Sequence, residues 1–514
     1  MDLARPAVSE PDQLVETHSA HVLMVGDRVF QWKKPLDLGF ADFRTLASRE
    51  LACREEVRLN RRLAPDVYLG VDVLRREDGT VREHVVVMRR LPAAARLGSL
   101  VVGGTDVHAA VHLLARLLAD FHSRCATSAR PETVAGPDRL RELWELGLDA
   151  LAADAELLDR EEVAEARSHV DAYVSGRGPL FSRRISSGQV RDGHGDLLAD
   201  DIFCMPDGPR ILDCLDFDPA LRHGDVLGDM ATLVMDLEHL GAPEAGEQLL
   251  HEYSEFSGEH HPSTLAHLYV AYRAQVRAKV ALVRAGQVTD PASHAHEVQQ
   301  ARQLTRLMIE HLRLTRVVLV LVGGLPGSGK STVADGLAAA TGALVLSSDL
   351  VRHQLDLPLA VRYSPEAVNH VYEVLLERAR AGLEQGWDVV IDASWADAGQ
   401  RAAAARLAVQ SHSSLLELRC DANDAIADRR LRNRPAGHPS DADPAVRRTM
   451  AAHDHPWPSA TALLTNGHPA DAVAAAVKAR WGVNTSSSTR QDVNAEGRCP
   501  GTGPSTLSQA RAPS

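Results

Sequence analysis

The spacing of apolar and polar positions divides the chain into two regions. In the first region, residues 21–25 and 28–33 alternate on either side of Gly26-Asp27, which predicts a β-hairpin. Apolar side chains between Val107 and Phe121 recur at intervals of four and three residues, which predicts a helix packed on a core. The region is completed by a helix over 43–63, a strand over 81–88, two short strands within 202–217 around a turn at 206–209, and helical segments over 138–176 and 225–312. It is therefore a small sheet followed by a mostly helical part.

From residue 316 onwards, short apolar strands alternate with helical segments, which is typical of a parallel sheet covered by helices. The predicted strands are 317–322, 343–347, 388–392, 414–419 and 462–465. The last residues are rich in Ser, Thr, Gly and Pro and have hardly any large apolar side chains, so they cannot form a core. We therefore predict an α+β domain over 1–313, an α/β domain over 316–483 and a disordered tail over 484–514.

Composition and charge limit the function. Charged residues make up 24% and apolar residues 45% of the 514 positions, as in ordinary globular proteins. The formal net charge of −13 disfavours nucleic acids and anionic membranes as partners. Six scattered cysteines lack metal-site spacing and are interpreted as reduced thiols, and no segment has the pattern of an export signal or a membrane span. We therefore expect a cytoplasmic protein.

A phosphate-binding loop follows the first strand of the second region. Gly324-Leu-Pro-Gly-Ser-Gly-Lys330-Ser331 fits the pattern Gly-x-x-x-x-Gly-Lys-Ser/Thr between a strand and a helix. The glycines let backbone amides turn towards phosphate oxygens, Lys330 can reach the β- and γ-phosphates of ATP, and the Ser331 hydroxyl can bind Mg²⁺. The chain has only five lysines, so a lysine here is informative. The predicted ATP-binding residues are Gly324, Leu325, Pro326, Gly327, Ser328, Gly329, Lys330, Ser331 and Thr332.

Further patterns in the second region resemble small P-loop kinases of the polynucleotide kinase, gluconate kinase and shikimate kinase type. The resemblance implies that in Asp349-Leu-Val-Arg352 the Asp faces the acceptor hydroxyl and the Arg holds the acceptor. Arg430 and Arg434 have the spacing of the arginine lid of these kinases, which closes over ATP. Asp392, at the end of the third strand, could hold a metal-bound water. The alternatives are a helix-capping Asp with a surface Arg, and a solvated arginine face.

The first region carries a second kinase-like motif. His194-Gly-Asp196-Leu-Leu-Ala-Asp-Asp201, with Asp213 and Asp216 further on, resembles the catalytic and metal loops of aminoglycoside phosphotransferases, which share the protein-kinase fold. The resemblance implies that Asp196 orients the substrate hydroxyl and accepts its proton, and that Asp213, or its rival Asp216, is the main Mg²⁺ ligand. Asp201 occupies a metal-binding position where the family has Asn. The added negative charge bears on catalysis in this domain more than on nucleotide binding.

The upstream residues extend this resemblance over most of the first 310 residues. Lys33 follows the hairpin turn and matches the family's strand lysine that contacts the α- and β-phosphates, with Lys34 as the alternative. Glu56 in the next helix matches the ion-pair partner of that lysine, with Glu55 next best. The segment 85–88 would be the hinge strand beside adenine. A kinase-fold domain that no longer turns over is the alternative interpretation.

Joined in this order, the two halves resemble bacterial fusions of an aminoglycoside phosphotransferase-like domain with a P-loop ATP-binding kinase domain. We predict an ATP- and Mg²⁺-dependent phosphotransferase in which both halves bind ATP and at least the second transfers the γ-phosphate to a hydroxyl of a small metabolite. One alternative is a nucleotide-binding regulatory ATPase with a pseudokinase first domain, which Asp201 favours. Another is a polynucleotide 5′-hydroxyl kinase, which the net charge opposes.

Overall fold

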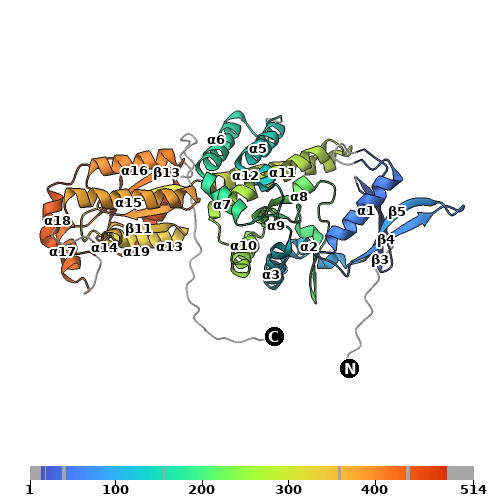
Figure 1. Ribbon diagram of the computed structural model, residues 1–514, viewed down its shortest axis with the longest axis horizontal. Coiled ribbons are helices and arrows are strands. Elements are labelled where there is room, and N and C mark those ends of the chain that lie inside the picture. The colour runs from blue at the N-terminus through green and yellow to red at the C-terminus, as the bar shows by residue number, and fades with distance from the viewer. Residues whose placement is uncertain are drawn as a thin grey trace, which may run out of the picture.

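The computed structural model describes residues 13–482 apart from residues 18, 38–41, 154–156, 357–360 and 436–439. Within these residues the chain forms an elongated molecule with a β-sheet lobe at one end, a helical lobe in the middle and an α/β domain at the other end (Figure 1). The predicted disordered tail lies outside the described residues. Within the described ranges, no helix is both long and apolar enough to cross a bilayer.

An antiparallel sheet with the strand order β1-β2-β3-β5-β4 forms the N-terminal lobe. Its strands are β1 (Gln13–Glu16), β2 (Ala20–Val25), β3 (Arg28–Lys33), β4 (Tyr68–Arg75) and β5 (Val81–Arg89), and helix α1 (Leu46–Asn60) packs on it. The predicted hairpin, the helix and the strand over 81–88 are confirmed. The sequence pattern does not predict β4, because Gly70 and Asp72 interrupt its apolar positions and the register shifts between Tyr68 and Gly70.

The middle lobe is mainly helical, as the 3.6-residue periodicity predicts. Its helices are η1 (Ala93–Ala95), α2 (Leu97–Val102), α3 (His108–Arg124), α4 (Pro131–Ala135), α5 (Pro137–Ala152), α6 (Arg160–Gly176), α7 (Gly178–Ser186), η2 (Ala199–Asp201), α8 (Pro219–Arg222), α9 (Val226–His239), α10 (Pro243–Ser257), α11 (Ser263–Ala285) and α12 (Pro291–Leu314). Two short antiparallel pairs lie among them, β6 (Val190–Asp192) with β9 (His223–Asp225), and β7 (Ile202–Met205) with β8 (Gly208–Ile211).

The β7–β8 hairpin confirms one prediction and corrects its length. The sequence predicts strand structure as far as residue 217, which is wrong, because β8 ends at Ile211. The chain then turns at Asp213, whose φ of 60° is the left-handed conformation that a strand does not accommodate. The segment after β8 is therefore an irregular loop that presents its carboxylates to the neighbouring cavity.

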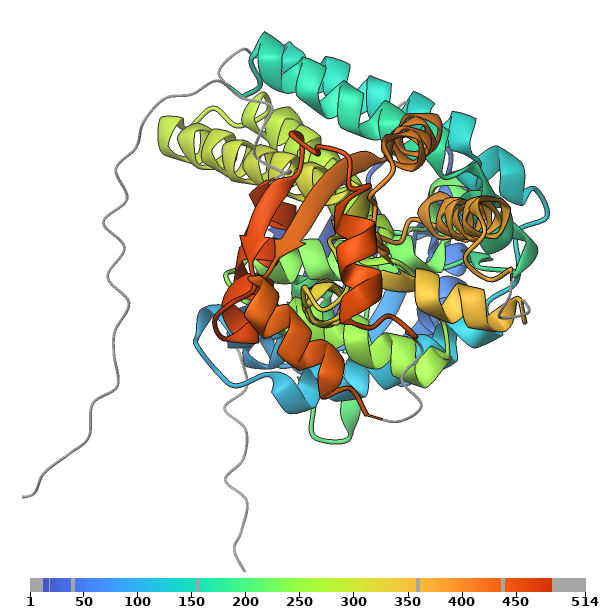
Figure 2. The same ribbon diagram turned by 90° about the vertical axis from the view of Figure 1, so that its left-hand side faces the viewer.

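The C-terminal domain is a parallel sheet with the strand order β11-β12-β10-β13-β14. Its strands are β10 (Val318–Gly323), β11 (Leu344–Ser347), β12 (Val389–Asp392), β13 (Ser414–Asp421) and β14 (Thr461–Leu464), which confirms the predicted set. Its helices are α13 (Lys330–Thr341), α14 (Ser348–Gln354), α15 (Pro365–Glu384), α16 (Ala398–Gln410), α17 (Asp424–Arg432), α18 (Pro444–Ala451) and α19 (Pro469–Gly482). Figure 2, seen from the end of the molecule, shows the helices on both sides of this sheet.

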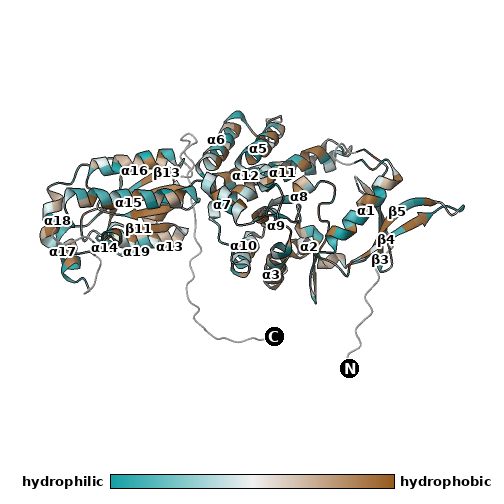
Figure 3. Ribbon diagram, viewed as in Figure 1, coloured by the Kyte–Doolittle hydropathy of each residue, from teal (hydrophilic) through white to brown (hydrophobic). Residues whose placement is uncertain are grey.

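Strand β10 lies in the middle of the sheet and is buried on both faces. Val320 packs with the side chains of α13 and α19, whereas Leu319 and Leu321 pack with α15 on the other face. Such burial explains the unbroken apolar run, since a central parallel strand has no solvent face (Figure 3). The core behind Leu319 continues into the helical lobe, so the two domains share one apolar cluster.

Candidate functional site

The loop between β10 and α13 has the shape of a phosphate cradle. Gly327 and Gly329 have φ values of 80° and 86°, which favour glycine. A Cβ atom on Gly327 would lie 2.8 Å from the carbonyl oxygen of Ala427, and one on Gly324 would lie 2.4 Å from that of Cys420. Helix α13 begins at Lys330, so its N-terminal amides and the lysine meet at the mouth of the loop. The predicted motif thus has the local geometry that its chemistry requires.

Side chains from distant parts of the domain hold this loop from behind. Arg447 Nη1 donates to the carbonyl oxygen of Pro326 at 2.8 Å, and the Thr465 hydroxyl donates to that of Ser328 at 2.5 Å. Neither contact is predicted from the sequence. Thr465 is the last residue of the fifth predicted strand, and this position at the carboxyl edge of the sheet could have identified it as a residue near the loop. Nothing in the sequence indicates Arg447. These bonds hold the loop in one conformation before any ligand binds, which lowers the ordering cost of binding.

The metal-binding prediction in this domain rests on Ser331 and Asp392. The Ser331 hydroxyl donates to Asp392 Oδ2 at 2.7 Å, while Asp392 Oδ1 is buried without a partner among the described residues. Burial raises the pKa of Asp392, and the charge of Lys330 opposes that rise. A buried carboxylate oxygen beside a hydroxyl is a donor set that suits Mg²⁺, which commonly takes one or two protein oxygens plus phosphate and water. The residues present therefore fit a Mg²⁺ ion.

Asp349 and Arg352 lie together on α14 at the same edge of the sheet. Arg352 Nη1 donates to Asp349 Oδ1 at 2.6 Å, and the Arg352 guanidinium stands 5.1 Å from the ring centre of Tyr363. Arg352 Nε is buried without a partner within the described residues. The negative charge of Asp349 contributes to the raised pKa of Asp392, so the carboxylate lies near the phosphate loop.

The two lid arginines have different surroundings. Arg430 Nη1 donates to Gly327 O at 3.3 Å and Nη2 to Thr465 O at 2.7 Å, so Arg430 braces the phosphate loop. Arg434 Nη1 donates to Ala442 O at 3.0 Å. Burial lowers the pKa of Arg434 while Asp349 raises it, which places Arg434 on the Asp349 side of the site. Closure of a lid over ATP stays a prediction.

In the N-terminal domain, Lys33 is the last residue of β3 and is buried. Its Nζ lies 2.9 Å from Glu56 Oε2 and 3.0 Å from Asp216 Oδ2. Burial alone would lower the pKa of Lys33, but the two carboxylates outweigh it and raise that pKa. The alternative residues, Lys34 and Glu55, do not form this ion pair. Lys34 pairs with Glu16 at the surface, and Glu55 pairs with Arg58.

The loop with His194, Gly195 and Asp196 follows β6 and is positioned by Asp229. Oxygens of Asp229 accept from the backbone amides of His194 at 2.6 Å and Gly195 at 2.8 Å. Burial would raise the pKa of Asp229, but the contact with His122 and these amide bonds hold that pKa well below its usual range. Asp196 itself is 39% exposed and lies 3.6 Å from Arg277 Nη1, so it can reach a substrate.

Carboxylates crowd the cavity between the two N-terminal lobes. Burial, together with the like charges of Asp213 and Asp196, raises the pKa of Asp201 well above its usual range. Burial also raises the pKa of Asp213, against the attraction of Lys33. Among the described residues, no three His, Cys, Asp or Glu side chains form a ready metal cage. The crowding nevertheless fits a Mg²⁺ ion that arrives with a nucleotide, since phosphate oxygens complete its coordination.

Asp213 and Asp216 both line the cavity, and Asp216 also contacts Lys33 while Asp213 has a left-handed backbone conformation. Both stay candidates for the metal ligand. The cavity has a volume of about 860 Å³. Of the predicted hinge strand only Met88 lines the cavity, followed by residues 89–91, because Val85 and Val86 are buried. Only the end of the predicted hinge strand therefore reaches the cavity, and its role beside adenine stays a prediction.

The two candidate sites lie at opposite ends of the molecule. The cavity with Lys33 and Asp196 lies between the β-sheet lobe and the helical lobe. The phosphate loop lies at the carboxyl edge of the C-terminal sheet, towards α14, α17 and α18, which Figure 1 shows at the far end from the N-terminal lobe. They are therefore separate sites.

Comparison with known proteins agrees with this division. Residues 319–456 match the family described as AAA domain. The chain is 40% identical over 477 residues to "Uncharacterized protein Rv2004c" of Mycobacterium tuberculosis (strain ATCC 25618 / H37Rv). The match covers 90% of this chain and 94% of that protein. "Uncharacterized protein Mb2027c" of Mycobacterium bovis matches to the same extent. The chain belongs to the family of these mycobacterial proteins.

Solved structures match each half separately. An unliganded sugar kinase from Janibacter sp. HTCC2649 is 21% identical and covers 33% of this chain and 96% of its own, with a TM-score of 0.26. The GDP and kanamycin complex of APH(2")-IIia is 19% identical and covers 59% of this chain and 95% of its own, with a TM-score of 0.38. These likenesses concern the fold alone. With the observed topology and the AAA match, the predicted joining of a kinase-fold domain to a P-loop domain is confirmed.

Proposed function

We propose that this protein is an ATP- and Mg²⁺-dependent phosphotransferase whose C-terminal domain transfers the γ-phosphate to a hydroxyl group of a small metabolite. The observation that carries the proposal is the braced phosphate loop with Ser331 hydrogen-bonded to Asp392, whose second carboxylate oxygen is buried and unpartnered. Such an oxygen is costly unless a cation satisfies it. The kinases among the structural matches support the same reaction class.

In this reaction the acceptor oxygen attacks the γ-phosphorus, a new O–P bond forms, and the bond from that phosphorus to the bridging oxygen of ADP breaks. The acceptor proton passes to the Asp349 carboxylate, while the Arg352 guanidinium, with its unpartnered Nε, holds the acceptor. Lys330 and Arg434 meet the negative charge that spreads over the transferring group. Mg²⁺, held through Ser331 and Asp392, would neutralise phosphate charge.

The N-terminal domain binds a second nucleotide in the cavity between its lobes. Lys33, held by Glu56, contacts phosphates, Asp201 and either Asp213 or Asp216 hold the metal, and Asp196 accepts the acceptor proton. Because Asp201 replaces a neutral amide, turnover in this domain is slower than in the C-terminal domain. The five described cysteines are free thiols, in keeping with a cytoplasmic place of action.

The test is a phosphorylation screen of a metabolite library with ATP and Mg²⁺, using the full chain and mass detection of the added phosphate. Asp349→Asn should remove products made by the C-terminal domain, and Asp196→Asn those made by the N-terminal domain. Asp471→Asn, an exposed carboxylate on α19, is the matched control and should change neither. If the wild-type chain neither phosphorylates a compound nor hydrolyses ATP, the proposed function is wrong.

A further inference from the structure

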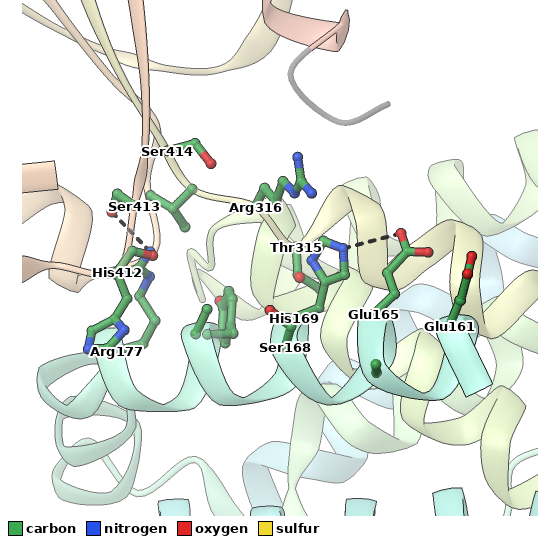
Figure 4. A pocket seen from close by; sticks show the side chains of 14 residues that line it. Glu161, Glu165, Ser168, His169, Arg177, Thr315, Arg316, His412, Ser413 and Ser414 are labelled. Atoms are coloured by element: carbon green, nitrogen blue, oxygen red, sulfur yellow. Dashed lines mark hydrogen bonds and ion pairs between the residues drawn. The ribbon is translucent and has the colours of Figure 1, made fainter. Parts of the chain in front are cut away.

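A pocket of about 630 Å³ lies between the two domains and is separate from both nucleotide sites. Helix α6 forms one wall, and the starts of β10 and β13 form the other (Figure 4). The phosphate loop follows the opposite, carboxyl end of β10. No residue of the pocket belongs to that loop or to the N-terminal cavity. The pocket is thus a third site whose walls come from different domains.

Arg177 gives this pocket a buried positive charge. Its side chain is only 1% exposed. Nη1 donates to the carbonyl oxygens of Ser411 at 2.6 Å and Gly176 at 2.9 Å, and Nη2 contacts His412 O at 3.3 Å and Ser413 Oγ at 3.1 Å. All four acceptors are neutral. Within the described residues Arg177 contacts no carboxylate and its Nε has no partner. The Tyr173 ring, 5.7 Å away, and the charges of Asp388 and Glu384 offset only part of the cost of burial, which lowers the pKa of Arg177 to about 10.

A second guanidinium, that of Arg316, lines the same pocket. Burial lowers the pKa of Arg316, the negative charge of Glu165 opposes that effect, and the positive charges of Arg313 and Arg480 add to it. Glu165 also binds Arg313 through both of its oxygens, at 2.8 Å and 3.0 Å. The guanidinium groups of Arg313 and Arg316 thus share the single charge of Glu165.

The pKa of His169, on the same wall, is affected by the positive charge of Arg316. Burial and then Arg316 lower the pKa of His169 to about 4, although Glu165 lies 3.6 Å from its Nε2. Glu161, the other acidic residue of the pocket, lies at the far end from Arg177 (Figure 4). An anion between Arg177 and Arg316 would thus meet favourable charge on both sides.

The turn that opens this wall has an unusual residue. His412 follows α16 with a φ of 48°, the left-handed position where helices usually end in glycine. A side chain there costs roughly 1 kcal/mol relative to glycine. The next two residues, Ser413 and Ser414, also line the pocket. The Ser413 hydroxyl donates to Ser411 O at 3.2 Å, so the Ser414 hydroxyl is the one that can donate to an oxyanion. The turn thus adds polar groups to the pocket at some cost to stability.

We propose that this interdomain pocket binds a small organic anion, through a phosphate or carboxylate group held by Arg316 and Ser414 in the field of the buried Arg177. The anion lies between Arg177 of the N-terminal domain and Arg316 of the C-terminal domain, so its charge stabilises their packing. Strand β10 begins beside this pocket and ends at the phosphate loop, so a bound anion can influence the phosphate loop through this strand.

The test is calorimetric titration of the full chain with inorganic phosphate and, separately, with citrate. The protein is first saturated with Mg²⁺ and a non-hydrolysable ATP analogue, so that both nucleotide sites are filled and cannot take up the probe. We expect saturable binding of at least one probe with one equivalent, and a rise in the thermal midpoint. The probe that binds more tightly distinguishes a phosphate from a carboxylate ligand.

Variants connect this binding to the pocket. Arg316→Gln should weaken binding about tenfold or more, because a charged hydrogen bond to the anion is lost. Arg139→Gln is the matched control, since it removes a surface arginine paired with Glu142 and should leave binding unchanged. Should Arg316→Gln fail to fold, Ser414→Ala takes its place, with an expected loss of about threefold.

Two results would overturn the proposal. One is the absence of saturable binding of either probe at millimolar concentration. The other is binding that Arg316→Gln, or Ser414→Ala where that variant is used, leaves as strong as in the Arg139→Gln control.

Discussion

The two candidate nucleotide sites are built on different physical principles. In the C-terminal domain the site is formed mainly by the main chain, because glycines with positive φ and the first turn of α13 form a cradle for phosphate. The side chains of Arg447, Thr465 and Arg430 hold this cradle in place. In the N-terminal domain the site is formed mainly by side chains, since several carboxylates lie close to one lysine, Lys33.

This difference predicts different responses to ligands. A braced main-chain cradle is ordered before the nucleotide arrives, so binding there costs little reorganisation. Crowded carboxylates repel one another until a cation joins them, so the N-terminal site depends more strongly on Mg²⁺. If both halves bind ATP as proposed, they should therefore be separable by metal dependence as well as by mutation.

The largest expected effect comes from Lys330→Ala. Removing the ammonium that meets the β- and γ-phosphates should reduce turnover in the C-terminal domain by about 1,000-fold. The nucleotide-induced thermal shift of the N-terminal domain should remain. Both are measured by ATP turnover and by thermal denaturation with and without nucleotide. Lys478→Ala, which removes an exposed lysine of the same domain, is the control. An equal loss of ATP turnover and of the nucleotide-induced thermal shift would mean that the chain has one shared nucleotide site, which would contradict the division into two sites.

A smaller effect is expected from Lys33→Ala. The variant loses nucleotide binding in the N-terminal cavity and leaves Glu56 and Asp216 buried without their cation, which should lower the free energy of unfolding by about 3 kcal/mol. Lys34→Ala breaks a pair with the exposed Glu16 and should cost much less, because water screens a surface pair. Chemical denaturation monitors both variants. Similar losses for the two lysines would contradict the placement of Lys33 at the site.

The smallest effect is expected from Asp201→Asn, studied in the Lys330→Ala background. With one charge fewer, Mg²⁺ affinity of the N-terminal site should fall on the order of tenfold. Folding raises the pKa of Asp201, so this carboxyl costs stability once the pH exceeds its unfolded pKa of about 4.

The Mg²⁺-free variant should therefore be more stable than its parent at neutral pH, with a weaker loss of stability as pH rises above 4. Metal titration and denaturation at several pH values check both points. An unchanged Mg²⁺ affinity would mean that Asp201 is not near the metal.

Some features of the site could be predicted because they depend on local patterns. The run from Gly324 to Ser331 specifies its own backbone shape, and the strand before it and the helix after it follow from apolar periodicity. Lys33 and Glu56 were found through a resemblance in order along the chain. The support from Arg447 and the contact of Asp216 with Lys33 could not be predicted, because they join residues 121 and 183 positions apart.

The sequence by itself determined most of the elements, where the phosphate loop lies and which carboxylates are available, since these depend on short-range periodicity and backbone preference. The tertiary structure alone decided which carboxylate contacts Lys33, that Arg430 braces the loop, and that a buried Arg177 without a contacting carboxylate lies between the domains. The reason is physical: charge and burial act through space, and whether a charge is paired depends on neighbours that only packing brings together.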